Sequence, residues 1–107
     1  MWKYAEYSSF MVYNEATNYQ MHVSRYSGNA GEHGFSHVDG MMFSTYDRDN
    51  DRWSGNCAEY NGGGFWYKDC SLAGVNGVRD RGNDFGWQGY TSVGATRLQT
   101  SRMWLTC

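Results

Sequence analysis

The sequence predicts an α+β domain that is mostly antiparallel β, with long ordered loops between its strands. Aromatic residues make up 18% of the 107-residue chain, which has 14 glycines and no proline. Leucine, isoleucine and valine are scarce, so aromatic rings and methionine must fill most of the interior, which favours a sheet-and-loop protein over a helical bundle. A chain of this length forms one domain that buries roughly 60 to 70% of the surface its unfolded form exposes.

The first predicted element is a β-hairpin. Residues 10–13 are apolar and aromatic and residues 19–26 alternate apolar and polar side chains, so the two stretches are expected to form strands joined by a turn at Asn14 and Glu15. In the second strand Tyr19, Met21 and Val23 recur at every other position, so they should share one buried face.

The rest of the chain is richer in turn formers. We expect a short helix near Ala30, a strand over residues 41–45 and a last strand over residues 95–105. Residues 47–64 are turn formers almost throughout and end at an apolar anchor, residues 65–67. Long ordered loops of this kind usually carry a function or a ligand.

Charge and hydropathy exclude two classes of partner. The net charge of −2 arises from 11 acidic and 9 basic residues that are interspersed, so no basic stripe is available to neutralise phosphates, and nucleic acid is not expected. No apolar run reaches the length of a membrane span. The residues after Met1 lack the layout of a signal peptide, so a secreted protein would have its targeting segment outside this chain.

Three aspartates at alternate positions, Asp47, Asp49 and Asp51, point to a cation. Carboxylates gathered this closely repel one another and need a cation or strong hydrogen bonds. An EF-hand would require glycine and glutamate where this chain has Arg52 and Ala58, so the loop is not an EF-hand.

Two interpretations of this acidic loop remain open from the residues alone. Backbone carbonyls at Trp53 and Gly55 are available, which is enough for a modest calcium site of the extracellular type. The alternative is a solvated acidic turn neutralised by Arg48 and Arg52.

The three cysteines, Cys57, Cys70 and Cys107, allow one disulfide and one remaining thiol. The alternative is a reduced cytosolic protein with small buried thiols. A zinc site or a reactive Cys/His pair would need His33 and His37 on one side of a helix, but the glycine between them weakens the helix that would align their rings. Surface or hydrogen-bonded histidines, and no enzyme activity, are therefore expected.

Five motifs follow one another along the chain: SGNAG (27–31), FSTYDRDND (43–51), NCAEY (56–60), GGGFWYKDC (62–70) and NG (76–77). In this order they resemble the C-terminal globular domain of fibrinogen and its relatives, the ficolins, tachylectins and other fibrinogen-related lectins. The resemblance is strong over residues 5–70 and loose over residues 71–105. It implies that residues 1–107 form a single partial, truncated fibrinogen C-terminal-like domain whose N-terminal subdomain is absent.

The resemblance implies a calcium site with four ligands. Its matching positions are the side chains of Asp49 and Asp51 and the backbone carbonyls of Trp53 and Gly55, with Asp47 beside the site. It also pairs Cys57 with Cys70 in a disulfide and implies a cis peptide between Asp69 and Cys70.

The same resemblance implies a ligand-binding turn. The N–H groups of Asp69 and Cys70 would donate to the carbonyl oxygen of an acetyl group, and nearby rings would hold its methyl group. Tyr60, Tyr67 and Tyr90 are the candidate walls, with Tyr67 equally placed to be a core residue. Two departures weaken this pocket: Ser71 stands where many members have histidine, and TSVGATRLQT replaces an aromatic segment.

Two functions follow as expectations. The first is a secreted, calcium-supported, lectin-like module that recognises acetylated carbohydrate or similar groups. The second is a structural or assembly subunit of an extracellular complex that keeps the scaffold without binding sugar. Acetylated glycans or other protein subunits are the expected partners, and an oligomer is expected, with Cys107 either free or joined to a second chain.

Overall fold

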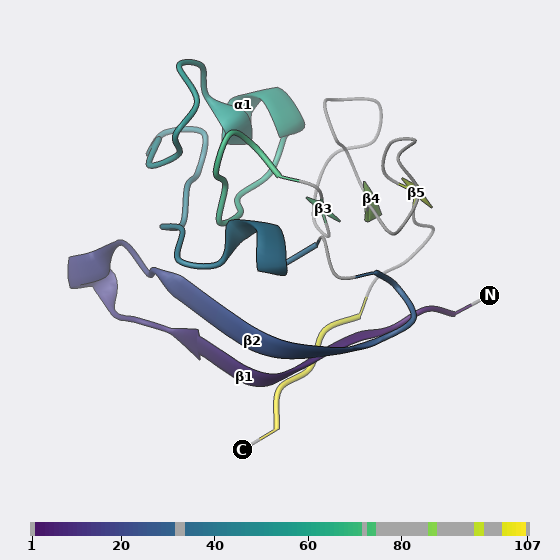
Figure 1. Cartoon of the computed structure of the whole chain (residues 1–107). Helices are drawn as coiled ribbons and strands as arrows, with labels where there is room; N and C mark the ends of the chain where they lie inside the picture. Colours follow the sequence, from purple (N-terminus) through teal and green to yellow (C-terminus); the bar gives the residue numbers. More distant parts are fainter. Residues whose placement is uncertain are drawn as a thin grey trace.

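In a computed structural model, the described part of this chain contains two small antiparallel sheets, one short α-helix and two 3-10 helices (Figure 1). The structure describes residues 2–31, 34–71, 73–74, 86–87, 96–97 and 102–106. The elements are β1 (Ala5–Val12), the 3-10 helices η1 (Glu15–Thr17) and η2 (Ser36–Val38), β2 (Met21–Gly28), α1 (Cys57–Asn61), β3 (Ala73–Gly74), β4 (Gly86–Trp87) and β5 (Thr96–Arg97). The predicted α+β class with mostly antiparallel strands and long loops is confirmed.

The predicted hairpin is present as β1 and β2. The strands pair antiparallel from Ala5 opposite Gly28 to Val12 opposite Met21, so the first strand begins earlier than predicted. Met21 and Val23 are buried as expected. The placement of Tyr19 beside them is wrong, because a left-handed backbone (φ 56°) keeps Tyr19 outside the strand and its side chain is exposed.

Two other predicted elements are wrong. No helix is present at Ala30 or at the other described residues next to it, and the nearest helical turn is η2. Residues 41–45 form no strand, because Ser44 and Thr45 make only isolated bridges, to Phe65 and Arg48. Of the last predicted strand, β5 is present, residues 102–106 form no regular element, and the remainder lies outside the described residues.

The loop predicted over residues 47–64 contains α1, which was not expected. The Asn56 side chain accepts a hydrogen bond from the backbone N–H of Glu59, which caps the helix at its N-terminus. Gly62 ends the helix in the left-handed conformation, φ 79°. An amide residue followed three positions later by glutamate is a sequence signal for a helix start that could have located α1.

Aromatic rings and methionine fill the core, as the composition predicts. Phe35 lies at its centre, with ring centroids 5.4 Å from Phe65, 5.9 Å from Tyr7 and 6.2 Å from Trp66. The Tyr7 and Phe35 rings meet edge to face at 80°, which suits the ring quadrupoles, and the other two pairs are tilted. The buried core residues are Met21, Val23, Phe35, Val38, Met41, Cys57, Ala58, Phe65 and Tyr67.

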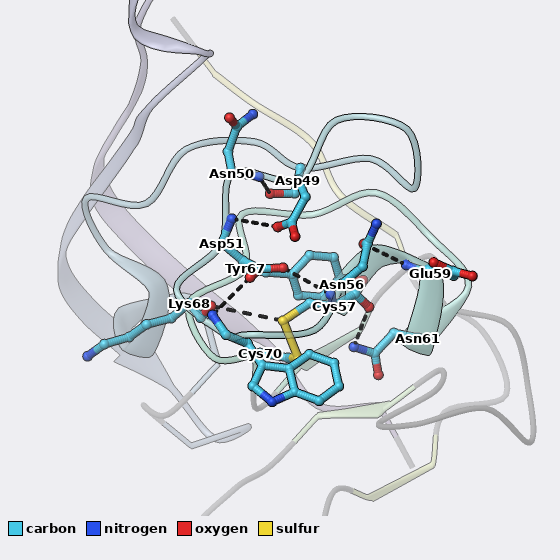
Figure 2. The surroundings of a disulfide bond; sticks show 12 residues. Asp49, Asn50, Asp51, Asn56, Cys57, Glu59, Asn61, Tyr67, Lys68 and Cys70 are labelled. Atoms are coloured by element: carbon cyan, nitrogen blue, oxygen red, sulfur yellow. Dashed lines mark hydrogen bonds between the residues drawn. A yellow bond between two sulfur atoms is a disulfide. The ribbon is translucent and has the colours of Figure 1, made fainter.

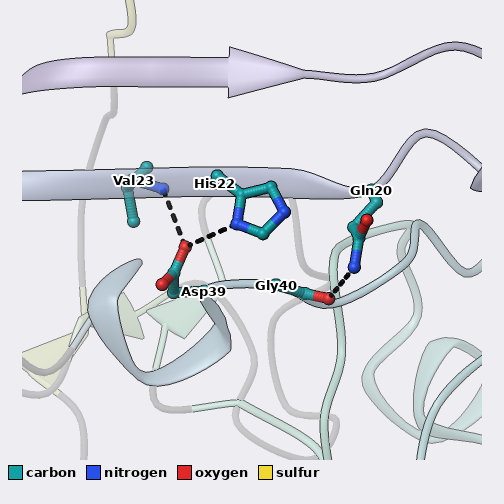
Figure 3. A network of polar contacts seen from close by, with 5 residues as sticks. All are labelled: Gln20, His22, Val23, Asp39 and Gly40. Atoms are coloured by element: carbon teal, nitrogen blue, oxygen red, sulfur yellow. Dashed lines mark hydrogen bonds and ion pairs between the residues drawn. The ribbon is translucent and has the colours of Figure 1, made fainter.

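Polar contacts fix the segment after η2 against β2 (Figure 3). The Asp39 carboxylate accepts a hydrogen bond from the Val23 N–H at 2.9 Å and lies 3.5 Å from the His22 ring nitrogen. The Gln20 amide donates to the Gly40 carbonyl at 2.8 Å. The long loop that follows therefore starts from a fixed point on the hairpin.

In the part of the chain that the structure describes, no helix is long and apolar enough to span a membrane.

Candidate functional site

The acidic loop is anchored to the core at its start. The Asn50 backbone N–H donates to the Ser44 hydroxyl, and the Asn50 side-chain amide donates to the Phe43 carbonyl, both at 2.9 Å. Ser44 is fully buried and exchanges backbone hydrogen bonds with Phe65. Asn50 therefore places the aspartates on either side of it at a defined position on the surface.

Asp51 is the central side chain of the loop (Figure 2). One of its carboxylate oxygens accepts from the Trp53 N–H and the other from the Cys57 N–H, each at 2.9 Å. The Asp49 carboxylate accepts in turn from the Asp51 N–H at 3.1 Å. These bonds bring the two carboxylates together and tie them to the start of α1.

Asp47 lies apart from this pair. Its carboxylate accepts a hydrogen bond from the Thr45 hydroxyl at 2.7 Å, so it stabilises the turn that precedes the loop.

The electrostatics of the carboxylate pair favour a cation. Burial raises the pKa of Asp51 most, and the neighbouring Asp49 raises it further, against the opposing hydrogen bond from the Cys57 N–H. Within the described residues no ion pair joins Arg48 or Arg52 to these aspartates. The arginines on which the solvated-turn interpretation depends thus make no direct ion pair with these carboxylates among the described residues.

Backbone oxygens complete a donor set that fits calcium. None of the described residues donates a hydrogen bond to the carbonyl of Trp53 or of Gly55, so both oxygens are available. The structure gathers no group of three His, Cys, Asp or Glu side chains among the residues it describes. Asp49, Asp51 and the two carbonyls are an all-oxygen set with two charged members, which suits a hard cation held weakly.

A disulfide joins this loop to the predicted ligand-binding turn. Cys57 and Cys70 are bonded, as predicted, and the peptide between Asp69 and Cys70 is cis, as the resemblance implied. The Lys68 carbonyl accepts from the Arg52 N–H, and the Lys68 N–H donates to the Cys70 carbonyl, both at 2.7 Å. The N–H groups of Asp69 and Cys70 donate to no described residue.

The residues predicted to line the pocket are divided between surface and core. Tyr60 lies on α1 with 55% of its surface exposed, whereas Ser71 is buried. Tyr67 is a core residue: it is 3% exposed and its hydroxyl donates to the Gly63 carbonyl at 2.6 Å. Burial, followed by the charge of Asp51, raises the pKa of Tyr67 to about 12. Tyr90, together with Cys107 and His33, lies outside the described residues.

Sequence reasoning missed two features of the site. The Asn56 side chain, besides capping α1, donates to the Tyr46 carbonyl at 2.9 Å, so it links the helix to the start of the loop. The ring of Trp53 meets the ring of Tyr60 edge to face, with centroids 5.8 Å apart. The resemblance implies a role for the Trp53 carbonyl only, and no pattern in the sequence indicates where the Trp53 ring lies.

Comparison with known proteins identifies the same family that the motifs indicated. The profile of the family described as fibrinogen beta and gamma chains, C-terminal globular domain, matches residues 2–104. The human fibrinogen alpha chain is 44% identical over 92 residues, covering 77% of this chain and 10% of that protein. Human angiopoietin-related protein 7 is 35% identical over 99 residues, covering 83% and 29% respectively.

Solved structures agree. The fibrinogen-like globe domain of human ANGPTL2 superposes with a TM-score of 0.71 at 38% identity, covering 92% of this chain and 44% of that one. Lamprey fibrin D-dimer, solved with the peptide Gly-His-Arg-Pro-amide, gives 0.64 at 31% identity, covering 82% and 29%. The chain thus spans less than half the length of these relatives. With its disulfide, its fold and its matched sequence taken together, the chain belongs to the family of the fibrinogen C-terminal globular domain.

Proposed function

We propose that this chain is an extracellular, calcium-supported recognition module that binds acetylated carbohydrate or similar groups at the turn formed by Asp69 and Cys70. The observation that carries the proposal is the pair of backbone N–H groups at this turn, which donate to no described residue. Unpaired donors of this kind suit the carbonyl oxygen of an acetyl group.

Calcium would serve a supporting role rather than contact the ligand. The side chains of Asp49 and Asp51 and the carbonyls of Trp53 and Gly55 would hold the ion. Its positive charge would offset the repulsion between the two carboxylates. Asp51 also accepts from the Cys57 N–H, and Cys57 is bonded to Cys70, so the ion's loop and the ligand's turn are joined through one residue.

Ligand recognition here would depend mainly on backbone groups. With Tyr67 in the core and Ser71 buried, Tyr60 is the exposed candidate wall in the described part of the turn region. A site that depends mainly on backbone groups, with one exposed ring in its described part, predicts weak binding of a single sugar, which several copies of the chain on one surface would strengthen.

The test is retention of the protein on immobilised N-acetylglucosamine and on immobilised glucosamine, in calcium and in chelator. We expect retention on the acetylated sugar alone, in calcium alone, with release by free N-acetylglucosamine. Equal behaviour on both sugars would contradict acetyl recognition. Retention on the acetylated sugar in chelator would contradict the supporting role of calcium but leave the acetyl site standing.

A structural or assembly role is the second candidate, and an apolar groove favours it. The groove has a volume of about 470 Å³ and lies between the hairpin and the C-terminal segment that crosses it in Figure 1. Its lining residues are Phe10, Val12, Trp66, Met103, Trp104 and Leu105. Exposed apolar surface of this kind marks many contacts between proteins. A folded protein that is retained on neither sugar in either condition would favour this role.

A further inference from the structure

The side chain of Trp53 folds back over the loop that carries it. A β-carbon added at Gly55 would lie 2.7 Å from two carbons of the Trp53 ring and 2.9 Å from a third. These separations are shorter than real side-chain contacts allow, so the ring occupies the space directly above the Gly55 α-carbon. Only glycine at position 55 leaves room for it.

This packing links the two residues whose carbonyls belong to the proposed calcium site. The Trp53 N–H donates to the Asp51 carboxylate at 2.9 Å, and the Trp53 ring packs on Gly55. The backbone between Trp53 and Gly55 is therefore held at both ends. The two carbonyl oxygens have no hydrogen bond from the described residues to orient them. The backbone on either side is held by the hydrogen bonds of Asn56 and of the Cys57 N–H, and contact between the ring and Gly55 adds a constraint on the segment between them.

The ring also contacts α1. Tyr60 meets it at a centroid distance of 5.8 Å and an interplanar angle of 68°, a favourable edge-to-face geometry. Tyr60 follows Cys57 by less than one helical turn, and Cys57 is fixed by the disulfide. Trp53, Gly55 and Tyr60 thus form a clamp, which we name the Trp53 clamp, across the loop.

We propose that the Trp53 clamp sets the calcium affinity of the loop by holding the carbonyls of Trp53 and Gly55 in the direction of Asp49 and Asp51. Trp53 is a positioning residue through its ring, in addition to the role of its carbonyl. This inference rests on the proposed calcium site. Groups that orient metal ligands without touching the metal commonly change affinity by about 10- to 100-fold when removed.

Two substitutions test the clamp while leaving every proposed ligand in place. Trp53→Ala removes the ring, and Gly55→Ala displaces it, yet both carboxylates and both carbonyls remain. We expect each variant to bind calcium about tenfold more weakly than the unmodified protein. Because the second substitution acts only through the ring, the double variant should be no weaker than Trp53→Ala alone. Trp53→Phe, which restores a ring, should recover most of the affinity.

The measurement is a calcium chloride titration followed by amide and indole N–H signals in NMR, with unfolding in chelator measured for every variant. Trp2→Ala is the matched control, because it removes an exposed tryptophan whose ring meets no ring of the loop among the described residues. A purely structural ring would lower stability in chelator and leave calcium affinity unchanged, which would overturn the inference. Additive losses in the double variant would also overturn it.

The outcome separates this inference from the calcium proposal. If the unmodified protein shows no calcium-dependent shift, both fail. If it binds calcium and Trp53→Ala binds equally well, the clamp alone fails. If Trp53→Ala does not fold, the other two variants test the clamp. The clamp requires that Gly55→Ala weakens calcium binding and that Trp53→Phe retains it.

Discussion

At the scale of single residues, Asp51 explains why the loop holds its shape and why we propose a cation there. Its carboxylate accepts two backbone N–H groups, from Trp53 and Cys57, which favours the ionised form. Burial and the neighbouring Asp49 work in the opposite direction, and together they raise its pKa. The hydrogen bonds order the loop, but they leave two carboxylates close together without a counter-charge, and this is the condition that calcium would relieve.

Replacing Asp49 by alanine should separate these two effects. Asp49 accepts a single backbone hydrogen bond at the surface, so loss of the Asp49 side chain should change the stability in chelator little. Removing a like charge beside Asp51 should offset part of the stability that is lost with this hydrogen bond. In calcium the same substitution removes one of two charged ligands. We expect it to abolish most of the rise in Tm that calcium gives the unmodified protein, with half of that rise reached on the order of 10⁻⁴ M calcium.

Asp47→Ala is the control for this measurement. The substitution removes the same charge from the same loop. The native Asp47 carboxylate, however, contacts the Thr45 hydroxyl rather than Asp51. The rise in Tm with calcium should survive in this variant. An equal loss of Tm for Asp49→Ala in calcium and in chelator would contradict a metal role for Asp49.

At the scale of elements, the short helix α1 organises the site. It begins at Cys57, so its first residue is both the partner of Cys70 and the donor to Asp51. A helix this short is not stable by its own propensity and depends on its caps and on its packing. Asn56 supplies the N-terminal cap and also holds the Tyr46 carbonyl.

Asn56→Ala should therefore destabilise the protein and weaken calcium binding together. Loss of an N-cap typically lowers the free energy of unfolding by about 1 kcal/mol, and frayed ends of α1 would no longer hold the Cys57 N–H toward Asp51. Urea unfolding in chelator and a calcium titration measure the two effects. Asn14→Ala, which removes the cap of η1 at the tip of the hairpin, should cost stability without changing calcium affinity.

The elements that the sequence predicted well are those whose signal is local. Alternation identified the hairpin, and the buried pair Met21 and Val23 follows from it. Tyr19 was misplaced because alternation does not reveal a left-handed backbone, and Asn18 and Tyr19 both adopt one. The strand expected over residues 41–45 failed because Ser44 pairs only with Phe65, a contact set by tertiary packing.

At the scale of the whole molecule, the candidate site was predictable mainly through family resemblance. Spacing alone left calcium and a solvated turn equally open, and three cysteines did not reveal which two would pair. The motifs identified the disulfide and the cis peptide that the structure shows. Neither spacing nor motifs located the Trp53 ring over Gly55, because that contact depends on the direction of a side chain after the loop has folded.

The disulfide should account for a large share of the stability of the whole molecule. The described core is small, and half-buried rings such as Phe10 and Trp66 pack against it from the surface. The bond closes a loop with a sequence separation of 13, for which the chain-entropy model gives about 3 kcal/mol. Folded domains of this size are stable by only about 5 to 15 kcal/mol, so this loss is severe.

Replacing both Cys57 and Cys70 by alanine should lower the free energy of unfolding by about 3 kcal/mol, measured by urea denaturation in chelator. Calcium should then restore less stability than it gives the unmodified protein, because the start of α1 is no longer fixed beside Asp51. Cys107→Ala is the control for general loss of a cysteine. A double variant with unchanged stability but lost calcium response would show that the bond positions the site without holding the fold together.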